Sequence, residues 1–172
     1  LSFVKNNKLM AGIKDLKPKK GGQYKQGYYE PIYPQKYKTN SKQIIYRSSW
    51  EFKLCKWFDL TPEVIEWASE PVSIKYFYTL DNRMHTYYPD FYFAYKKPDG
   101  TILKYIVEVK PTSQLQKPEE PKRKTPNTVK NYNYLMEAFI KNSCKRQYAK
   151  KWCSENGYIF VYVTEKSNLN FL

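Results

Sequence analysis

Three side chains near the middle of the chain are suited to chemistry on a phosphate. Asp90 lies in the segment YYPDFYFAYKK, and Glu108 and Lys110 lie in YIVEVKP, with the turn sequence PDG between them. Two carboxylates that are close together repel each other, and a divalent cation offsets that repulsion. Carboxylate oxygens suit Mg²⁺ or Mn²⁺, and a nearby ammonium can orient water or stabilise charge on a phosphate. We therefore favour a metal site, with an exposed hairpin and a solvated Glu108–Lys110 pair as the alternative.

The spacing around the turn decides whether the carboxylates can meet. Segments 86–95 and 102–110 alternate as two strands of a β-hairpin. A turn centred between Pro98 and Asp99 places Asp90 opposite the residue that precedes Glu108. Turn geometry can shift this pairing by one residue, so the two carboxylates are expected to be near neighbours.

The alternation of side chains along the second strand sorts its residues by face. Glu108 and Lys110 share one face of the strand, and Val107 and Val109 share the other, where they can pack against a helix. Because β-branched and aromatic residues surround Glu108, a strand that lies wholly at the surface fits poorly. We therefore expect the carboxylates and the lysine to project together beside apolar strands.

Composition limits the classes of function. The net charge is +14, from 30 Lys and Arg against 16 Asp and Glu, which favours a polyanion partner over solubility alone. The single histidine, His85, excludes a site of several histidines. Cys55, Cys144 and Cys153 match no zinc spacing and are expected to be reduced thiols. No membrane span, signal peptide or small-molecule cofactor motif is recognised.

Residues 1–43 are expected to form an extended basic arm before one domain at 44–172. Residues 1–9 precede Met10 and are interpreted as a remnant or an upstream extension outside the fold. Residues 14–42 contain eight lysines, and their tyrosines are expected either to stack on bases or to fix the arm to the domain. Basic residues of the arm and of loop 111–127 are predicted to bind nucleic-acid phosphates without reading sequence: Lys19, Lys20, Lys25, Lys36, Lys38, Lys42, Lys122, Arg123 and Lys124.

The flanking sequence predicts the elements that position the site. A helix is expected from 49 to 59, because Ser48 and Glu51 have capping-box spacing and apolar residues follow at helical intervals. A long helix is expected from 129 to 155, with Gly157 as its C-terminal signal. The other expected elements are a turn or short helical piece at 61–67, strands at 72–79, 86–95 and 102–110, a mobile loop at 111–127 and a buried strand at 158–164. This order implies an α/β/α or α+β sandwich.

These residues resemble those of a known family. Pro89–Asp90 and the sequence EVK at 108–110 match the motif of PD-(D/E)XK nucleases, and Glu51 fits the acid that these enzymes carry on an upstream helix. The predicted order of elements is similar to the restriction-endonuclease-like αβββαβ core, a central mixed sheet flanked by helices. The resemblance covers residues 46–165.

The resemblance implies a metal-dependent deoxyribonuclease. Lys110 would orient the attacking water or the scissile phosphate, with Lys145 as a weaker candidate for the same work. Glu51 has two competing interpretations, as a metal ligand, which we prefer, or as the reciprocal residue of the capping box. The implied ligands of one or two Mg²⁺ or Mn²⁺ ions are Glu51, Asp90, Glu108 and the Val109 carbonyl.

The long helix and the end of the chain narrow the resemblance. Asn142 and Lys145 interrupt the apolar face of the helix, and polar residues on an inward face need partners that an active site would supply. The segment from Asn142 to Glu165 is similar to the ending of head-completion nucleases of T-even-type tailed bacteriophages. That likeness implies an exonuclease or endonuclease that trims packaged DNA before head and tail join. It also implies phage head and neck proteins as partners, and a location in the host cytoplasm during assembly or in the virion neck.

The sequence leaves two alternatives open. One is a structural DNA-binding component of the phage neck that uses the nuclease fold without catalysis. The presence of both carboxylates and the lysine argues against it. The other is a site-specific enzyme such as a restriction or TnsA-like endonuclease, which the lack of a recognisable separate recognition module disfavours.

Overall fold

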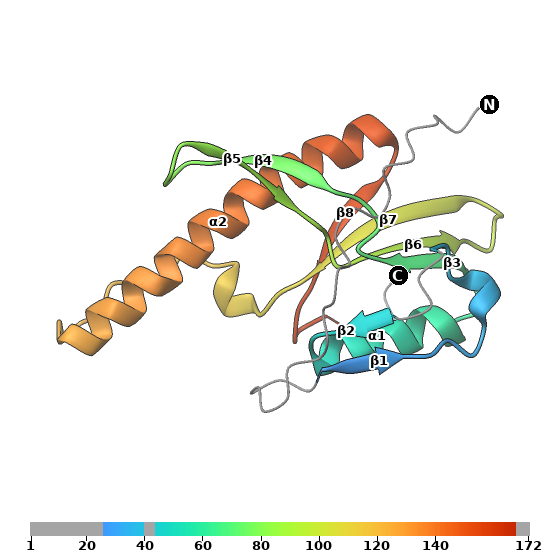
Figure 1. The fold of residues 1–172 in the computed structure, drawn as a ribbon, viewed down its shortest axis with the longest axis horizontal. Coiled ribbons are helices and arrows are strands. Elements are labelled where there is room, and N and C mark those ends of the chain that lie inside the picture. The colour runs from blue at the N-terminus through green and yellow to red at the C-terminus, as the bar shows by residue number, and fades with distance from the viewer. Residues whose placement is uncertain (1–25, 40–43, 168–172) are drawn as a thin grey trace.

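The centre of the molecule is a four-stranded mixed sheet with a helix on each face (Figure 1). The computed structural model describes residues 26–39 and 44–167. In the order β3-β6-β7-β8, the first three strands are antiparallel neighbours and β8 runs parallel to β7. The sheet consists of β3 (Val64–Ser69), β6 (Phe91–Lys96), β7 (Ile102–Val109) and β8 (Ile159–Val163), and the helices are α1 (Ser49–Leu60) and α2 (Pro126–Asn156).

Helix α1 covers one face of the sheet. The side chain of Ser48 accepts a hydrogen bond from the Glu51 N–H and caps the helix. Leu54, Cys55 and Phe58 are buried, and they pack in the main core cluster against apolar residues of β3, β6 and β7. The expected helix at 49–59 is therefore confirmed, because capping and apolar spacing are local signals that tertiary packing did not override.

The segment 61–67 was wrongly predicted. It was expected as a turn or short helical piece, but Val64–Ser69 is strand β3, which pairs with β6. Val64, Trp67 and Ala68 are buried. A bulge between Val64 and Glu66 shifts the register of this strand, so the period-two pattern that identifies a strand is interrupted in the sequence.

The segment expected as one strand at 86–95 is two strands that belong to different sheets. β4 (Ile74–Tyr78) and β5 (Arg83–Tyr87) form a separate two-stranded sheet, and β6 begins only at Phe91. Pro89 has no N–H for a ladder and lies in the break between them. The three sheet strands that precede α2 are therefore β3, β6 and β7, and the expected strand at 72–79 is a strand of the outer hairpin.

The β6–β7 hairpin is shifted by one residue from the expected pairing. The Lys97 N–H donates to the Thr101 carbonyl at 2.8 Å, so the turn is centred on Asp99. Gly100 adopts a φ of 85°, a left-handed conformation that glycine tolerates without strain. This three-residue loop pairs Phe91 with Val107.

The long helix α2 covers the other face of the sheet and extends past it. Thr125 caps its first turn, and Gly157 at φ 74° ends it in the left-handed conformation. The C-terminal half of α2 lies against β8 and the β4–β5 hairpin, while its N-terminal half projects beyond the sheet (Figure 1). The prediction of a helix at 129–155 is confirmed, with a start three residues earlier. No described helix is long and apolar enough to cross a membrane.

The expectation of an extended arm is wrong for residues 26–39. β1 (Gly27–Tyr29) pairs with β2 (Ile44–Tyr46), and a short 3-10 helix η1 (Pro34–Lys36) follows β1. The buried carboxylate of Asp59 accepts hydrogen bonds from the Tyr29 hydroxyl at 2.8 Å and from the N–H groups of the next loop. Tyr29 and Tyr37 both pack against Trp67. At these two positions the tyrosines fix the segment to the domain.

The part of the arm before residue 26 lies outside the described residues. This includes Lys19, Lys20 and Lys25, and the same holds for Lys42. The loop expected to be mobile at 111–127 contains a short 3-10 helix, η2 (Thr112–Gln114), which contacts α2. The three cysteines are buried free thiols, as expected.

Candidate active site

Asp90 is fixed at the start of β6 by its backbone and its side chain. Its carbonyl accepts a hydrogen bond from the Glu70 N–H at 3.0 Å, and its Oδ2 accepts one from the Val109 N–H at 2.7 Å. Glu70 in turn forms a 2.7 Å ion pair with Arg47, before α1. Burial raises the pKa of Asp90 to about 7, and the charge of Glu108 adds to that rise.

Glu108, near the end of β7, and Lys110, just after it, lie beside Asp90 on the sheet face that α2 covers. Continuing the observed register places Asp90 opposite Glu108. Lys110 Nζ lies 3.1 Å from Glu108 Oε1. Burial alone would lower the pKa of Lys110, but the charges of Glu108 and Asp90 raise it, so the ammonium stays protonated. The predicted cluster of two carboxylates and a lysine is therefore assembled.

Within residues 26–39 and 44–167, one oxygen of this cluster has no hydrogen-bond partner. Glu108 is 5% exposed, and its Oε2 is buried without a hydrogen bond. A buried carboxylate oxygen in this state carries a desolvation cost that a cation or a donor would remove. The site therefore has an unmet requirement for positive charge or a hydrogen-bond donor at Glu108.

Glu51 lies near these carboxylates but is engaged in capping. Its Oε2 accepts from the Arg47 N–H at 2.8 Å and its Oε1 from the Ser48 hydroxyl at 3.0 Å. In a capping box, the glutamate accepts a bond from the backbone N–H of the N-cap residue. Here Glu51 accepts it from Arg47, the residue before the N-cap Ser48. Burial raises the pKa of Glu51, and the charge of Asp90 adds to that rise. The capping role is observed, and the ligand role stays a prediction.

Helix α2, which covers the sheet face that carries Glu108 and Lys110, contributes Lys145 to the site. Its Nζ lies 5.0 Å from the centre of the Tyr87 ring and 5.9 Å from that of Tyr76. Burial lowers the pKa of Lys145, and the nearby charge of Glu108 opposes this effect. Lys145 therefore lies within electrostatic reach of the carboxylates.

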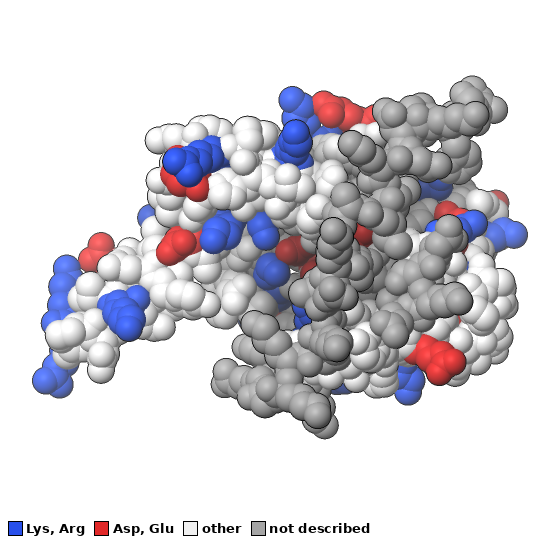
Figure 2. All heavy atoms as spheres, viewed as in Figure 1, with Lys and Arg blue, Asp and Glu red and all other residues white. Residues whose placement is uncertain are grey.

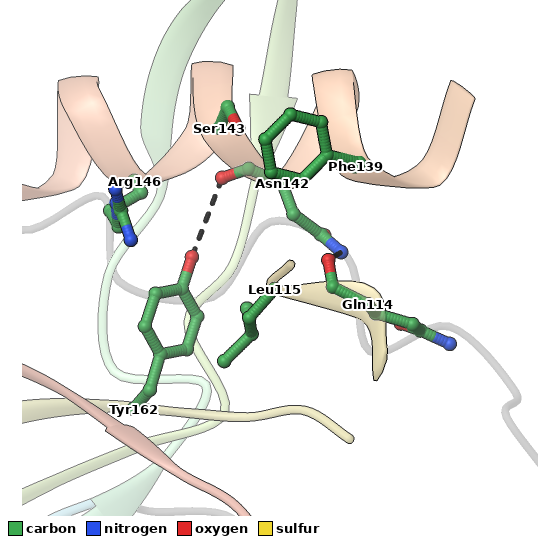
Figure 3. A pocket seen from close by; sticks show the side chains of 7 residues that line it. All are labelled: Gln114, Leu115, Phe139, Asn142, Ser143, Arg146 and Tyr162. Atoms are coloured by element: carbon green, nitrogen blue, oxygen red, sulfur yellow. Dashed lines mark hydrogen bonds between the residues drawn. The ribbon is translucent and has the colours of Figure 1, made fainter. Parts of the chain in front are cut away.

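Asn142 is the other polar residue that was expected on the inward face of α2. It connects α2 to η2 and β8 beside the site. Its side-chain amide donates to the Gln114 carbonyl at 3.1 Å, and the Tyr162 hydroxyl donates to the Asn142 carbonyl at 3.4 Å (Figure 3). These groups and Leu115 line a shallow hollow between η2, α2 and β8. The partners of Asn142 therefore come from the loop and from β8, and its role is to link the helix to them.

Two tyrosines near the site were missed from the sequence. Tyr162 pairs in register with Glu108 on the neighbouring strand, and burial together with the Glu108 charge raises its pKa. Tyr87 lies three residues before Asp90, and burial and the Glu108 charge raise its pKa too. For Tyr87, the only signal in the sequence was its proximity to Asp90. The break between β5 and β6, which brings Tyr87 to the site, was not predicted.

The residues fit a divalent ion in part. Among residues 26–39 and 44–167, no group of three or more His, Cys, Asp or Glu side chains already has metal-binding geometry. Protein donors occupy both oxygens of Glu51 and one oxygen each of Asp90 and Glu108. The buried, unpartnered Oε2 of Glu108 and its repulsion with Asp90 are what a cation would relieve.

The described residues predicted to bind DNA fall into two groups. Lys36 Nζ donates to the carbonyls of Asp59 and Thr61, and Lys38 forms a 2.9 Å ion pair with Glu66. These two lysines therefore have partners within the domain. Lys122, Arg123 and Lys124 are exposed before α2, so their side chains are accessible to a phosphate.

Comparisons with known proteins agree with this arrangement. Over 139 residues, the chain is 29% identical to the head completion nuclease of Enterobacteria phage T4, covering 81% of this chain and 90% of that protein. No solved structure matches the present chain significantly.

The family comparison covers most of the site. Residues 61–165 match the family described as the TnsA-like endonuclease N-terminal domain, a region that includes Asp90, Glu108, Lys110 and Lys145 but not Glu51. The mixed sheet and its two helices confirm the restriction-endonuclease-like fold expected from the sequence. Because this match spans well over half of the sequence, the chain belongs to the family of TnsA-like endonuclease N-terminal domains.

Proposed function

We propose that this protein is a metal-dependent nuclease that hydrolyses phosphodiester bonds of DNA. The observation that carries the proposal is the cluster of Asp90, Glu108 and Lys110, in which the Oε2 of Glu108 is buried without a partner. Membership of an endonuclease family and the similarity to a head completion nuclease support it. The net charge of +14 supports a polyanionic substrate.

Each side chain of the cluster has a distinct role in this proposal. Asp90 and Glu108 would hold Mg²⁺ or Mn²⁺, joined by Glu51 and the Val109 carbonyl if Glu51 exchanges its capping bonds for the ion. A divalent ion there supplies Lewis acidity and neutralises charge that develops on the phosphate.

Two ammonium groups would act on the substrate itself. Lys110, fixed 3.1 Å from Glu108 Oε1, would orient the attacking water or a non-bridging oxygen of the scissile phosphate. An ammonium already in place costs little reorganisation when the phosphate charge develops. Lys145 approaches from α2 and would contact the same phosphate or its neighbour.

The similarity to the named relative supports a proposal for the biological setting. We propose that the protein acts in phage head completion in the host cytoplasm, where it processes packaged DNA before head and tail join. Head and neck proteins would be its partners. Similarity over 81% of the chain supports this role.

A plasmid-nicking assay tests the chemical part of the proposal. Supercoiled DNA should be relaxed or linearised with Mg²⁺ or Mn²⁺, and should stay intact with EDTA or with the Asp90→Asn variant. Cleavage in EDTA at the same rate would exclude metal dependence. DNA binding without cleavage under all metal conditions would favour the alternative of a structural DNA-binding protein of the neck.

A second candidate is a site-specific endonuclease of the TnsA type. The family match at residues 61–165 favours it. Sequencing of the cleaved ends separates the two, because a site-specific enzyme produces ends at one sequence, whereas contacts limited to phosphates give dispersed ends.

A further inference from the structure

Two lysines on α2 lie over tyrosine rings of the β4–β5 hairpin. Lys145 lies over the rings of Tyr76 and Tyr87, and Lys141 Nζ lies 5.2 Å from the centre of the Tyr78 ring. Lys141 and Lys145 are four residues apart on α2, a spacing that places side chains on the same helix face. The tyrosine face of the β4–β5 hairpin therefore keeps two like charges together.

The charges of Glu108 and Asp90 act on Lys145 from a distance, without a direct ion pair. Among the described residues, no carboxylate forms an ion pair with Lys145. Lys141 has only an exposed contact of 3.8 Å with Glu137, and such surface pairs contribute little stability. Two ammonium groups one helical turn apart that lie over aromatic rings and have no close buried ion pair among the described residues are suited to an external anion with charges at a matching spacing.

The geometry of α2 gives the direction of that anion. Lys141 and Lys145 are four residues apart, about one helical turn or 6 Å along the axis. Lys145 lies within electrostatic reach of the carboxylates, and Lys141 precedes it on α2, one turn nearer the N-terminal end of the helix. The N-terminal half of α2 projects beyond the sheet (Figure 1). Figure 2 shows basic side chains spread from that projecting half toward the centre of the face, where acidic side chains lie deeper.

From this arrangement we propose that Lys141 and Lys145 bind consecutive phosphates of the cleaved DNA strand and guide it from the active site along α2. This inference rests on the proposed nuclease function and adds the path of the substrate. Lys145 contacts the scissile phosphate or the next one, and Lys141 contacts the phosphate after it. Tyr76, Tyr78 and Tyr87 restrict where the two ammonium groups can lie before DNA arrives.

Helix α2 also provides a matched control for Lys141. Lys151 forms the same kind of contact with a glutamate four residues away, at 4.0 Å from Glu155. Replacement of either lysine by alanine removes one positive charge and one exposed Lys–Glu pair from the same helix. The difference is position, because the Lys141 side chain is 43% exposed over an aromatic ring and that of Lys151 is 74% exposed.

Salt-dependent binding in the inactive Asp90→Asn background tests the proposal. For duplex DNA, Lys141→Ala should reduce the slope of log affinity against log salt by about 0.9, the value for removal of a single phosphate contact. Lys151→Ala should leave the slope unchanged, and Lys141→Arg should restore it. In the active enzyme, Lys141→Ala should raise KM and leave kcat unchanged.

Two results would overturn the proposal. One is an unchanged slope for Lys141→Ala, and the other is an equal decrease in slope for Lys151→Ala, which would mean that general charge on the helix acts. Circular dichroism of each variant confirms that the helix is intact. Wild-type cleavage is measured separately, so absence of nuclease activity would remove the proposed function while the binding data still report on the lysines.

Discussion

The Oδ2 atom of Asp90 accepts a 2.7 Å hydrogen bond from the backbone N–H of Val109, which lies between Glu108 and Lys110. This bond joins the end of β7 to the residue before β6. It places a carboxylate from one strand beside the carboxylate and ammonium of the other. Substitutions at these positions and around them can test what this placement does.

Asp90→Asn and Glu108→Gln should each abolish DNA cleavage with the protein still folded. Both changes keep the shape of the side chain and remove a negative charge that the proposed ion requires. Plasmid nicking with Mg²⁺ measures the effect. Glu63→Gln, which changes an exposed carboxylate before β3, is the control and should cut at the wild-type rate. Wild-type cleavage by either site variant would refute the assignment.

Lys110→Met should lose cleavage and retain metal binding, because an ammonium cannot ligate a cation. Calorimetric titration with Mn²⁺ measures the second property. Lys104→Met removes a lysine from β7, the strand that Lys110 follows, and should retain both properties. If Lys110→Met lost Mn²⁺ binding with an intact fold, Lys110 would be organising the ligands and its proposed contact with the phosphate would be wrong.

Ser48→Ala and Glu51→Ala together separate the two roles of Glu51. Removal of the Ser48 cap should cost about 0.5–2 kcal/mol of stability and leave turnover unchanged. Glu51→Ala should cost stability and also stop cleavage. The measurements are urea unfolding and plasmid nicking on both variants. Equal behaviour of the two variants would restrict Glu51 to capping.

The stability of the metal-free protein should fall as pH rises. The pKa of Asp90 is raised from 3.8 to about 7 in the folded state, so the folded protein binds this proton more tightly than the unfolded chain does. That contribution to stability is complete below about pH 4 and is lost as pH rises through about 7. Urea midpoints in EDTA at pH 5 and pH 8 measure it.

Two comparisons make this pH test specific. Asp90→Asn should show a smaller loss of stability between pH 5 and pH 8, because the titrating group is gone. Mg²⁺ added to the wild type at pH 8 should restore stability through binding to the folded state. An unchanged pH dependence in Asp90→Asn would assign the effect to another group.

Deletion of residues 1–25 should weaken DNA binding and leave turnover at saturating DNA intact. The deletion removes seven lysines, and each phosphate that the protein no longer binds should lower the salt slope by about 0.9 on duplex DNA. Deletion of residues 1–42 is the contrasting case. It also removes β1 and the Tyr29–Asp59 hydrogen bond, so it should destabilise the fold. An unchanged salt slope after the shorter deletion would show that residues 1–25 do not contact phosphate.

Local chemistry in the sequence determined the parts of the fold that depend on few neighbours. The Ser48 cap, the left-handed Gly157 and the apolar spacing of the two helices were readable because each signal lies within a few residues of its effect. The β6–β7 hairpin was readable for the same reason. Because Glu108 and Lys110 are two residues apart in an extended segment, their position on one face followed from the sequence, and the structure shows them 3.1 Å apart.

Only the tertiary structure decided how the remaining elements assemble around that hairpin. The chain breaks at Pro89, so β5 and β6 belong to different sheets. The segment of β3 is buried as a strand of the central sheet, although a bulge interrupts its alternating pattern. Hydrogen bonds to Asp59 fix the segment around Tyr29 and Ile32 to the domain, whereas the lysines of this region had indicated a free arm. Tyr87 of β5 and Lys145 of α2 lie near the carboxylates because these two elements pack together there. These contacts join residues far apart in the chain, and burial and hydrogen-bond satisfaction of that kind leave no periodic signal in a single sequence.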